Sequence, residues 1–143
     1  MADSEATIGL GTAFQLRSGT SPTYTYTDIG EAVSITPPNP TRETVDVTHL
    51  KSPNGTREFK GTLRDGGEAS VMFNFTPAAY AQASDLFMDD EVQHFRILYP
   101  EGDSDDFSAI VTGKPSEPIE VDSVRRFTLP MKVTGLPTYV PAP

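Results

Sequence analysis

The chain of 143 residues contains no cysteine and no tryptophan, and it has only two histidines. The absence of cysteine excludes a disulfide scaffold, a thiol nucleophile and a cysteine-ligated metal or iron–sulfur site. His49 and His94 lie in strand-like segments and lack the H-x-x-H or H-x-E spacing of a metal site. Surface or strand-edge imidazoles are therefore the favoured interpretation of both residues.

Positive charge is also scarce. Eleven Lys and Arg stand against twenty Asp and Glu, which gives a formal net charge of −9. A generic nucleic-acid-binding protein needs clustered Lys and Arg to neutralise phosphates, so this composition argues against that class. It does not exclude a protein that has to repel DNA.

Long hydrophobic runs are missing as well. Hydrophobic residues make up 36% of the chain, and no stretch approaches the ~20 apolar residues of a membrane span. The segment Met1–Glu5 lacks the basic and apolar regions of a secretory signal peptide. We expect a soluble, acidic, cytosolic chain with no membrane partner, whose residues 1–143 form a single domain.

The chain has thirteen prolines and eleven glycines, which argue against a helical bundle. Instead, apolar and polar residues alternate over several short segments, the pattern of half-buried strands. Seven to nine such strands predict a mainly β fold, a β-sandwich or barrel. Asp65-Gly66-Gly67 is predicted to form a tight hairpin turn between two of the strands. The predicted strands surround residues 14–16, 23–27, 45–47, 59–63, 68–75, 95–99, 107–111, 119–121 and 127–133.

One segment has a helical pattern. Thr76 is a suitable N-cap, and Pro77 fits the first helical position because its missing N–H has no intrahelical partner there. Tyr80, Ala83 and Phe87 then recur at helical spacing. The sequence therefore predicts one short α-helix over about residues 77–88.

A proline-rich segment predicts a long excursion from the sheet. Pro37, Pro38 and Pro40 lack backbone N–H groups, so this segment cannot be a central strand or a helix interior. We expect it to open an arm over about residues 37–59, with the turn Pro53-Asn54-Gly55 at its tip. The ends, about 1–8 and 137–143, are expected to be flexible.

Motifs for catalysis are not found. The sequence lacks G-x-S-x-G, G-x-x-x-x-G-K-[ST] and G-x-G-x-x-G. Asp103 and Asp105 have the one-apart spacing of a calcium loop, but the glycine and the final glutamate of an EF-hand are missing, so a solvated acidic loop over 101–106 is favoured. We expect no catalytic residues, no metal and no cofactor, and we do not expect an enzyme.

A series of short motifs resembles the tail tube proteins of bacteriophages with long, non-contractile tails, relatives of the lambda-like major tail protein and of the type VI secretion tube protein. The resemblance spans roughly Gly11 to Pro137, and it lies in the order and spacing of the motifs rather than in any one of them. The motifs are Gly11–Leu16, Asp28–Ile35, Glu43–Thr48, Ser52–Phe59, Gly61–Glu68, Phe75–Pro77 and Arg126–Pro137.

The resemblance implies a structural virion protein with the tail tube fold. Such subunits form hexameric rings that stack into a tube, with four strands of each subunit in a continuous inner barrel, and the tube is the conduit for DNA ejection. Its partners would be further copies of the chain, the tail terminator, the tape measure and the baseplate, with genomic DNA passing through without specific binding. The protein would assemble in the host cytoplasm and reside in the virion tail. Many relatives carry an immunoglobulin-like C-terminal domain, for which this chain is expected to be too short.

Two groups of residues follow as candidate sites. The arm matches the family's inter-ring loop, and its candidate contact residues are Arg42, Lys51, Ser52, Pro53, Asn54, Gly55, Thr56 and Arg57. An acidic lumen would use polar residues opposite a buried apolar set, although alternation alone does not say which way either face points. This reasoning nominates Asp46, Thr48, Glu58, Lys60, Glu120 and Asp122.

Two alternatives remain open from the sequence. The chain could be another ring of the tail, such as a terminator or a baseplate hub. In a different class, it could be an acidic β-sandwich binding module, with calcium held by Asp103, Asp105 and Asp106.

Overall fold

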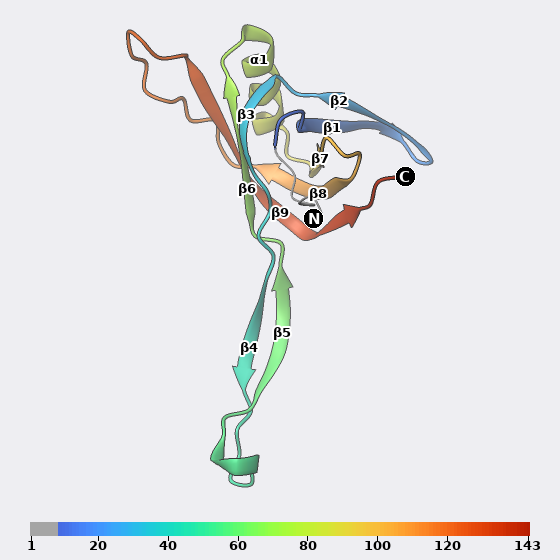
Figure 1. The fold of residues 1–143 in the computed structure, drawn as a ribbon, viewed down its shortest axis with the longest axis vertical. Helices are drawn as coiled ribbons and strands as arrows, with labels where there is room; N and C mark the ends of the chain where they lie inside the picture. Colours follow the sequence, from blue (N-terminus) through green and yellow to red (C-terminus); the bar gives the residue numbers. More distant parts are fainter. Residues whose placement is uncertain (1–8) are drawn as a thin grey trace, which may run out of the picture.

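The computed structural model describes residues 9–143 (Figure 1). The predicted flexible residues 1–8 lie outside this range. The described residues form nine strands, one α-helix and one 3₁₀ turn, which confirms the mainly β fold. The elements are β1 (Ala13–Thr20), β2 (Thr23–Asp28), β3 (Glu31–Thr36), β4 (Thr41–Asp46), η1 (Pro53–Gly55), β5 (Phe59–Asp65), β6 (Glu68–Asn74), α1 (Pro77–Met88), β7 (Gln93–Leu98), β8 (Ser104–Val111) and β9 (Arg126–Val140).

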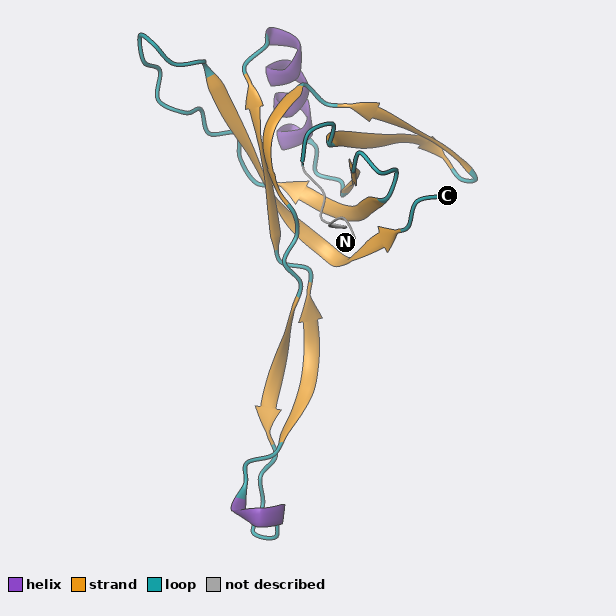
Figure 2. Ribbon diagram, viewed as in Figure 1, coloured by secondary structure: helices purple, strands orange, loops and turns teal. Residues whose placement is uncertain are grey.

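Seven of the strands form one antiparallel sheet in the order β2-β1-β7-β8-β9-β6-β3. The long strand β9 pairs through residues 126–132 with β6 and through residues 131–140 with β8. The sheet turns at β9, so that its two parts enclose the core, and we call this part of the molecule the body (Figure 2). Strands β2 and β3 are the two edges of the sheet.

The core is built around phenylalanine rings contributed by both parts of the sheet. Phe14 stacks on Phe95 with ring centroids 5.2 Å apart, and Phe73 stacks on Phe127 at 5.4 Å. Each of the four side chains is at most 1% exposed. Burying a side chain of this size stabilises the fold by roughly 1.5–3 kcal/mol. The alternation in the sequence correctly predicted these core positions.

Helix α1 begins and ends where its sequence predicts. The Thr76 side chain accepts a hydrogen bond from the Ala79 N–H at 3.2 Å, and Pro77 is the first helical residue. The buried face consists of Ala79, Ala83 and Leu86. Phe87, which the helical spacing placed on the apolar face, is 41% exposed.

The arm is a two-stranded sheet of β4 and β5 that projects from the body along the long axis of the molecule (Figure 1). It continues the pair β3 and β6, interrupted by residues 37–40 on one side and by Gly66-Gly67 on the other. The arm extends further than expected, because β5 runs to Asp65 and the chain rejoins the body only at Glu68.

The predicted hairpin at Asp65-Gly66-Gly67 is wrong. Strands β5 and β6 do not pair with each other and run on in the same direction (Figure 1). Gly67 does have the expected positive φ of 78°, and the Asp65 carboxylate accepts its N–H at 2.8 Å. A glycine at positive φ permits a bend as readily as a reversal, so the sequence could not distinguish the two.

Two further expectations are corrected. Residues 119–121 form no strand, because Ile119 is 71% exposed and Val121 fully exposed in the loop between β8 and β9. Thr138, Tyr139 and Val140, which fall within the end predicted to be flexible, belong to β9 and pair with β8. A short alternation was not enough to predict a strand, and a position near the end of the chain was not enough to predict flexibility. Neither feature shows whether another strand is present to pair with the segment.

Candidate functional site

The arm exposes apolar side chains that its own chain does not cover. Every residue of β4 and β5 is exposed, including Phe59 at 58% and Leu63 at 77%. Val45 is 48% exposed and Leu50, near the tip, is fully exposed. A two-stranded hairpin is marginally stable in water by itself, so one with exposed apolar side chains on both faces gains stability when a partner covers it. The arm is therefore the candidate functional site.

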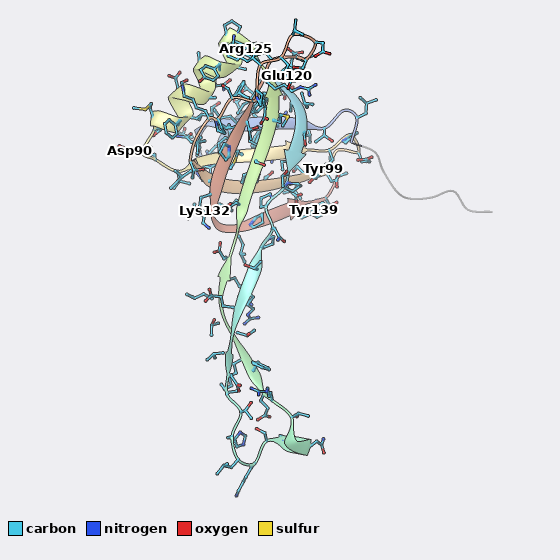
Figure 3. The ribbon with its side chains drawn as sticks, turned by 90° about the vertical axis from the view of Figure 1, so that its left-hand side faces the viewer. Asp90, Tyr99, Glu120, Arg125, Lys132 and Tyr139 are labelled. Atoms are coloured by element: carbon cyan, nitrogen blue, oxygen red, sulfur yellow. The ribbon has the colours of Figure 1, made fainter. Side chains whose placement is uncertain are left out.

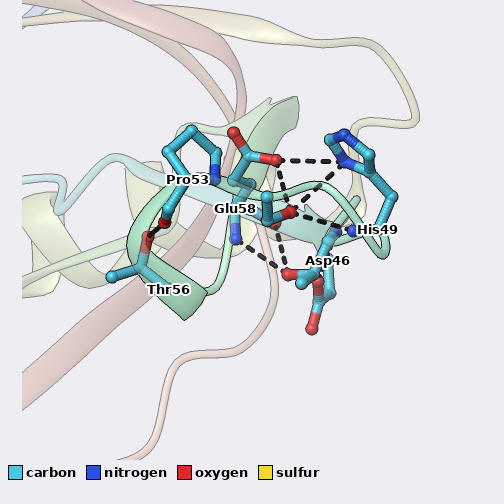
Figure 4. Close-up of polar contacts among 7 residues, drawn as sticks. Asp46, His49, Pro53, Thr56 and Glu58 are labelled. Atoms are coloured by element: carbon cyan, nitrogen blue, oxygen red, sulfur yellow. Dashed lines mark hydrogen bonds and ion pairs between the residues drawn. The ribbon is translucent and has the colours of Figure 1, made fainter.

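The tip of the arm, residues 47–58, is held by a hydrogen-bond network (Figure 4). The Ser52 hydroxyl donates to Glu58 Oε2 at 2.7 Å and accepts the His49 backbone N–H at 3.0 Å. His49 Nδ1 lies 3.2 Å from the same Glu58 oxygen. The Glu58 N–H donates to the Thr48 hydroxyl at 2.8 Å, so the two sides of the tip are tied together.

A second set of contacts orders the start and the turn of the tip. The Asp46 carboxylate accepts the Thr48 N–H at 2.8 Å and lies 3.5 Å from the Arg57 guanidinium. Hydrogen bonds from Thr48, followed by Arg57, hold the pKa of Asp46 below its ordinary value. At the turn, the Thr56 hydroxyl donates to the Pro53 carbonyl at 2.7 Å, and Asn54 has φ of 55°. The tip is thus ordered before it meets a partner, which lowers the entropic cost of binding.

The structure brings together most of the predicted arm residues. Residues 51–57 lie side by side at the tip, whereas Arg42 lies in β4 near the body, with its guanidinium against Gly61.

The six predicted lumen residues do not lie together. Asp46, Thr48, Glu58 and Lys60 belong to the arm, whereas Glu120 and Asp122 lie in the β8–β9 loop (residues 112–125) at the opposite end of the molecule (Figure 3). The apolar neighbours from which they were deduced are not buried: Val47 is 37% exposed, and Val45, Phe59, Ile119 and Val121 are exposed further. Asp46 and Glu58 moreover serve as acceptors inside the tip.

Charge is divided unevenly between the arm and the rest of the chain. Residues 41–65 contain five Lys and Arg against four Asp and Glu, a net charge of +1. Since the whole chain carries −9, the rest carries −10. The sequence analysis named most of these cations but missed the difference in net charge between the arm and the rest of the chain. Counting the charges over residues 41–65 shows that difference.

The acidic segment 101–106 has protein partners for its aspartates. The Tyr139 hydroxyl donates to Asp103 at 2.7 Å, the Tyr99 hydroxyl donates to Asp105, and Arg96 binds Asp106 through two hydrogen bonds of 2.8 and 2.9 Å. Burial, followed by the contact with Asp105, raises the pKa of Tyr99 well above its ordinary value. Among residues 9–143, no group of three or more His, Asp or Glu side chains is placed to hold a metal ion.

The two histidines lie at different ends of the molecule and do not form a joint site. His49 belongs to the arm tip, and His94 lies in β7 with its Nδ1 2.7 Å from the Ser108 hydroxyl. Burial, followed by the nearby Arg17 charge, lowers the pKa of His94.

A comparison with protein families decides what this architecture is. Residues 10–139 match the model described as lambda phage tail tube protein. The chain belongs to the lambda phage tail tube protein family. The match confirms the resemblance read from the motifs, and a structural role in the tube of a phage-like tail follows from it.

Solved structures similar to this tail tube protein share its fold. One is from the tail of an empty gene transfer agent particle with C6 symmetry, with a TM-score of 0.73, 21% identity, and coverage of 95% of this chain and 100% of that one. The SPP1 tail tube gives a TM-score of 0.68 at 10% identity, covering 94% and 79%. The sheath/tube terminator of an extracellular contractile injection system gives 0.67 at 9% identity, covering 96% and 99%.

A search of curated proteins finds no match to this tail tube protein. Among residues 9–143, no helix has the length and hydrophobicity needed to cross a membrane.

Proposed function

We propose that this tail tube protein forms hexameric rings, that the rings stack through the arm, and that the resulting tube conducts DNA. The observation that carries the proposal is the arm itself, an exposed two-stranded ribbon with apolar side chains and an ordered tip. Such an element gains stability when another subunit covers it.

Ring closure has support from the edges of the sheet. Strands β2 and β3 each have one side without a paired strand in the described residues. Unpaired edges invite association with other strands, and closure of strands into a ring removes them. A six-membered ring agrees with the C6 symmetry of the similar gene transfer agent tail.

Passage of DNA is supported by charge. Six chains of −9 carry −54 per ring, and screening over ~8 Å at physiological salt leaves a repulsive wall along a narrow channel.

The lumen position of Asp46, Thr48, Glu58, Lys60, Glu120 and Asp122 stays a prediction. If Glu120 and Asp122 line the channel, replacing both with Lys adds +24 per ring, and the tubes will bind short DNA in a salt-dependent way. Asp46 and Glu58 are better tested as Asn and Gln, because Lys would also break the tip network.

The experiment that tests stacking replaces Ser52–Thr56 with a short Gly-Ser link. We expect a folded protein that forms rings but no tubes, because the ordered turn and its contacts are lost. Negative-stain micrographs and circular dichroism measure the two properties. Asp85→Ser with Asp90→Ser is the control, because both residues are exposed, lie outside the arm and should leave tubes unchanged. Tubes of normal length in the Gly-Ser variant would contradict the proposal.

A second candidate is a terminator or baseplate ring. It is favoured by the fold similarity to the sheath/tube terminator and to an anti-feeding prophage baseplate structure, the latter with a TM-score of 0.65. The two functions differ in polymerisation. A tube protein alone forms stacks of indefinite length, whereas a terminator or hub stops at one or two rings, and micrographs of purified protein separate them.

A further inference from the structure

The β8–β9 loop has the character of a second interaction surface. Ile119 is 71% exposed, Val124 58% and Val121 fully exposed. Between them lie Glu120 and Asp122, and residues 115–124 contain three acids and no Lys or Arg. The end of the loop is therefore both apolar and negatively charged.

The base of this loop is fixed to the body, so its end is presented at a defined position. The Glu117 N–H donates to the Arg126 carbonyl at 3.0 Å, and the Thr128 N–H donates to the Pro115 carbonyl at 2.9 Å. The Thr128 hydroxyl also donates to Glu117 Oε1 at 3.0 Å. Glu120 and Asp122 have no protein donor to their side chains among the described residues, so they remain available to a partner.

The arm has the opposite charge and the same mixture of exposed groups. Lys51 at the tip and Lys60 at the start of β5 make no ion pair within 4.0 Å in the described part of the chain. Each lies beside an exposed apolar residue: Leu50 precedes Lys51, and Val45 is the cross-strand partner of Lys60. One surface thus offers cations with apolar side chains, and the other offers carboxylates with apolar side chains.

We infer that the arm of one copy docks on the β8–β9 loop of a second copy in the adjacent ring. The inference rests on the proposed stacking function and names the surface that receives the arm. The two surfaces lie at opposite ends of the long axis (Figures 1 and 3). A contact between opposite ends is heterologous, so each added ring presents a new receiving surface and the stack continues without limit.

Charge complementarity indicates that the partner of the β8–β9 loop is a second copy of this chain. The arm carries +1 while the rest of the chain carries −10, so an arm is attracted to the body of another copy. This assignment and the lumen prediction for Glu120 and Asp122 are alternatives. Salt-dependent DNA binding by tubes of the Glu120→Lys, Asp122→Lys variant supports the lumen position, and a raised protein concentration for assembly supports the ring-to-ring contact.

A charge-swap series tests the inference. Glu120→Lys with Asp122→Lys should raise the protein concentration needed for tubes by about tenfold, because the loop then repels Lys51 and Lys60 of the arriving arm. Lys51→Glu with Lys60→Glu should do the same, and the four changes together should restore tubes. Asp85→Lys with Asp90→Lys is the control, because it makes the same charge change at two exposed residues of the α1 region. Circular dichroism and thermal unfolding check that each variant is folded.

The outcomes distinguish the inference from the function it rests on. Restored tubes in the combined variant support the docking pair, as does loss of tubes in a separate Ile119→Ser, Val121→Ser variant that removes the apolar part. Normal tubes in the loop variant, with tubes lost in the Gly-Ser tip variant, would overturn the docking surface and leave stacking through the arm intact. Normal tubes in the tip variant as well would remove the stacking function itself.

Discussion

At the scale of single residues, two glycines explain how the arm can leave the body. A β-carbon on Gly66 would clash with the Gly135 carbonyl oxygen, and one on Gly67 would clash with the Asn39 carbonyl oxygen. Gly67 also has φ of 78°. Backbone from three segments meets here, and only residues without a side chain permit that approach.

Gly67→Ala should therefore destabilise the protein by about 2–4 kcal/mol, from the strain of a positive φ together with the clash. Urea unfolding followed by circular dichroism measures the change. Gly55→Ala is the matched control, because Gly55 has φ of 65° but nothing within 4 Å of the added carbon, so its cost is the strain alone. Equal losses in the two variants would show that the close approach at Gly67 has no energetic role.

His94 gives a prediction about pH. Because burial and Arg17 lower its pKa in the folded state, the unfolded chain binds a proton to this residue more readily. The free energy of unfolding should therefore fall as pH drops below 6.5, the ordinary value for histidine. Urea titrations at several pH values should show a shallower decline for His94→Gln than for the unchanged protein. Parallel profiles would mean that His94 titrates alike in both states.

At the scale of elements, the arm contributes no side chain to the hydrophobic core of the body. All buried hydrophobic residues lie outside residues 37–67. Residues 47–58 are joined to the body through β4 and β5, and their side-chain contacts are with one another and with Asp46 at the end of β4.

Removing residues 47–58 and closing β4 onto β5 with an Asn-Gly turn should change the free energy of unfolding by less than about 1 kcal/mol. Chemical denaturation of the shortened chain measures this. The unshortened chain is the reference, and the same shortened protein should fail to form tubes. A loss of several kcal/mol would indicate that the arm helps to hold the body together.

The elements also differ in how far the sequence predicts them. The helix was predicted in full because its signals, the Thr76 cap and Pro77, are local. The core strands were predicted because alternation coincides with burial in the same chain, as at Phe73 and Phe127. Val45 and Ile119 were predicted to be buried and are exposed. Alternation shows that a segment has one apolar and one polar face, but it does not show whether another part of the chain packs on the apolar face. The arm was predictable from its prolines as an excursion from the sheet, whereas the separation of the six lumen candidates between the arm and the β8–β9 loop was not.

At the scale of the whole molecule, the proposed ring formation and the proposed stacking would use different parts of the fold. The edges β2 and β3 belong to the body, and the tip lies at the far end of the arm. A change confined to the tip should leave ring closure untouched.

The Gly-Ser tip variant should therefore yield a species of about 93 kDa, six times the 15.5 kDa chain. Native mass spectrometry at high protein concentration measures it, with the unchanged protein as the reference for longer stacks. A strictly monomeric tip variant would mean that rings depend on stacking.

The continuity of β3 with β4 and of β5 with β6 has a mechanical consequence. A pull on the arm along the long axis is transmitted along strand β6, which pairs with β9 over seven consecutive residue pairs. Ladder hydrogen bonds of antiparallel strands run perpendicular to the strands, so such a pull loads them together in shear rather than peeling them apart one by one. In a tube joined through these arms, axial tension would be shared by all the hydrogen bonds between β6 and β9. Bending would stretch the convex side of the tube, where the same hydrogen bonds would carry the load together.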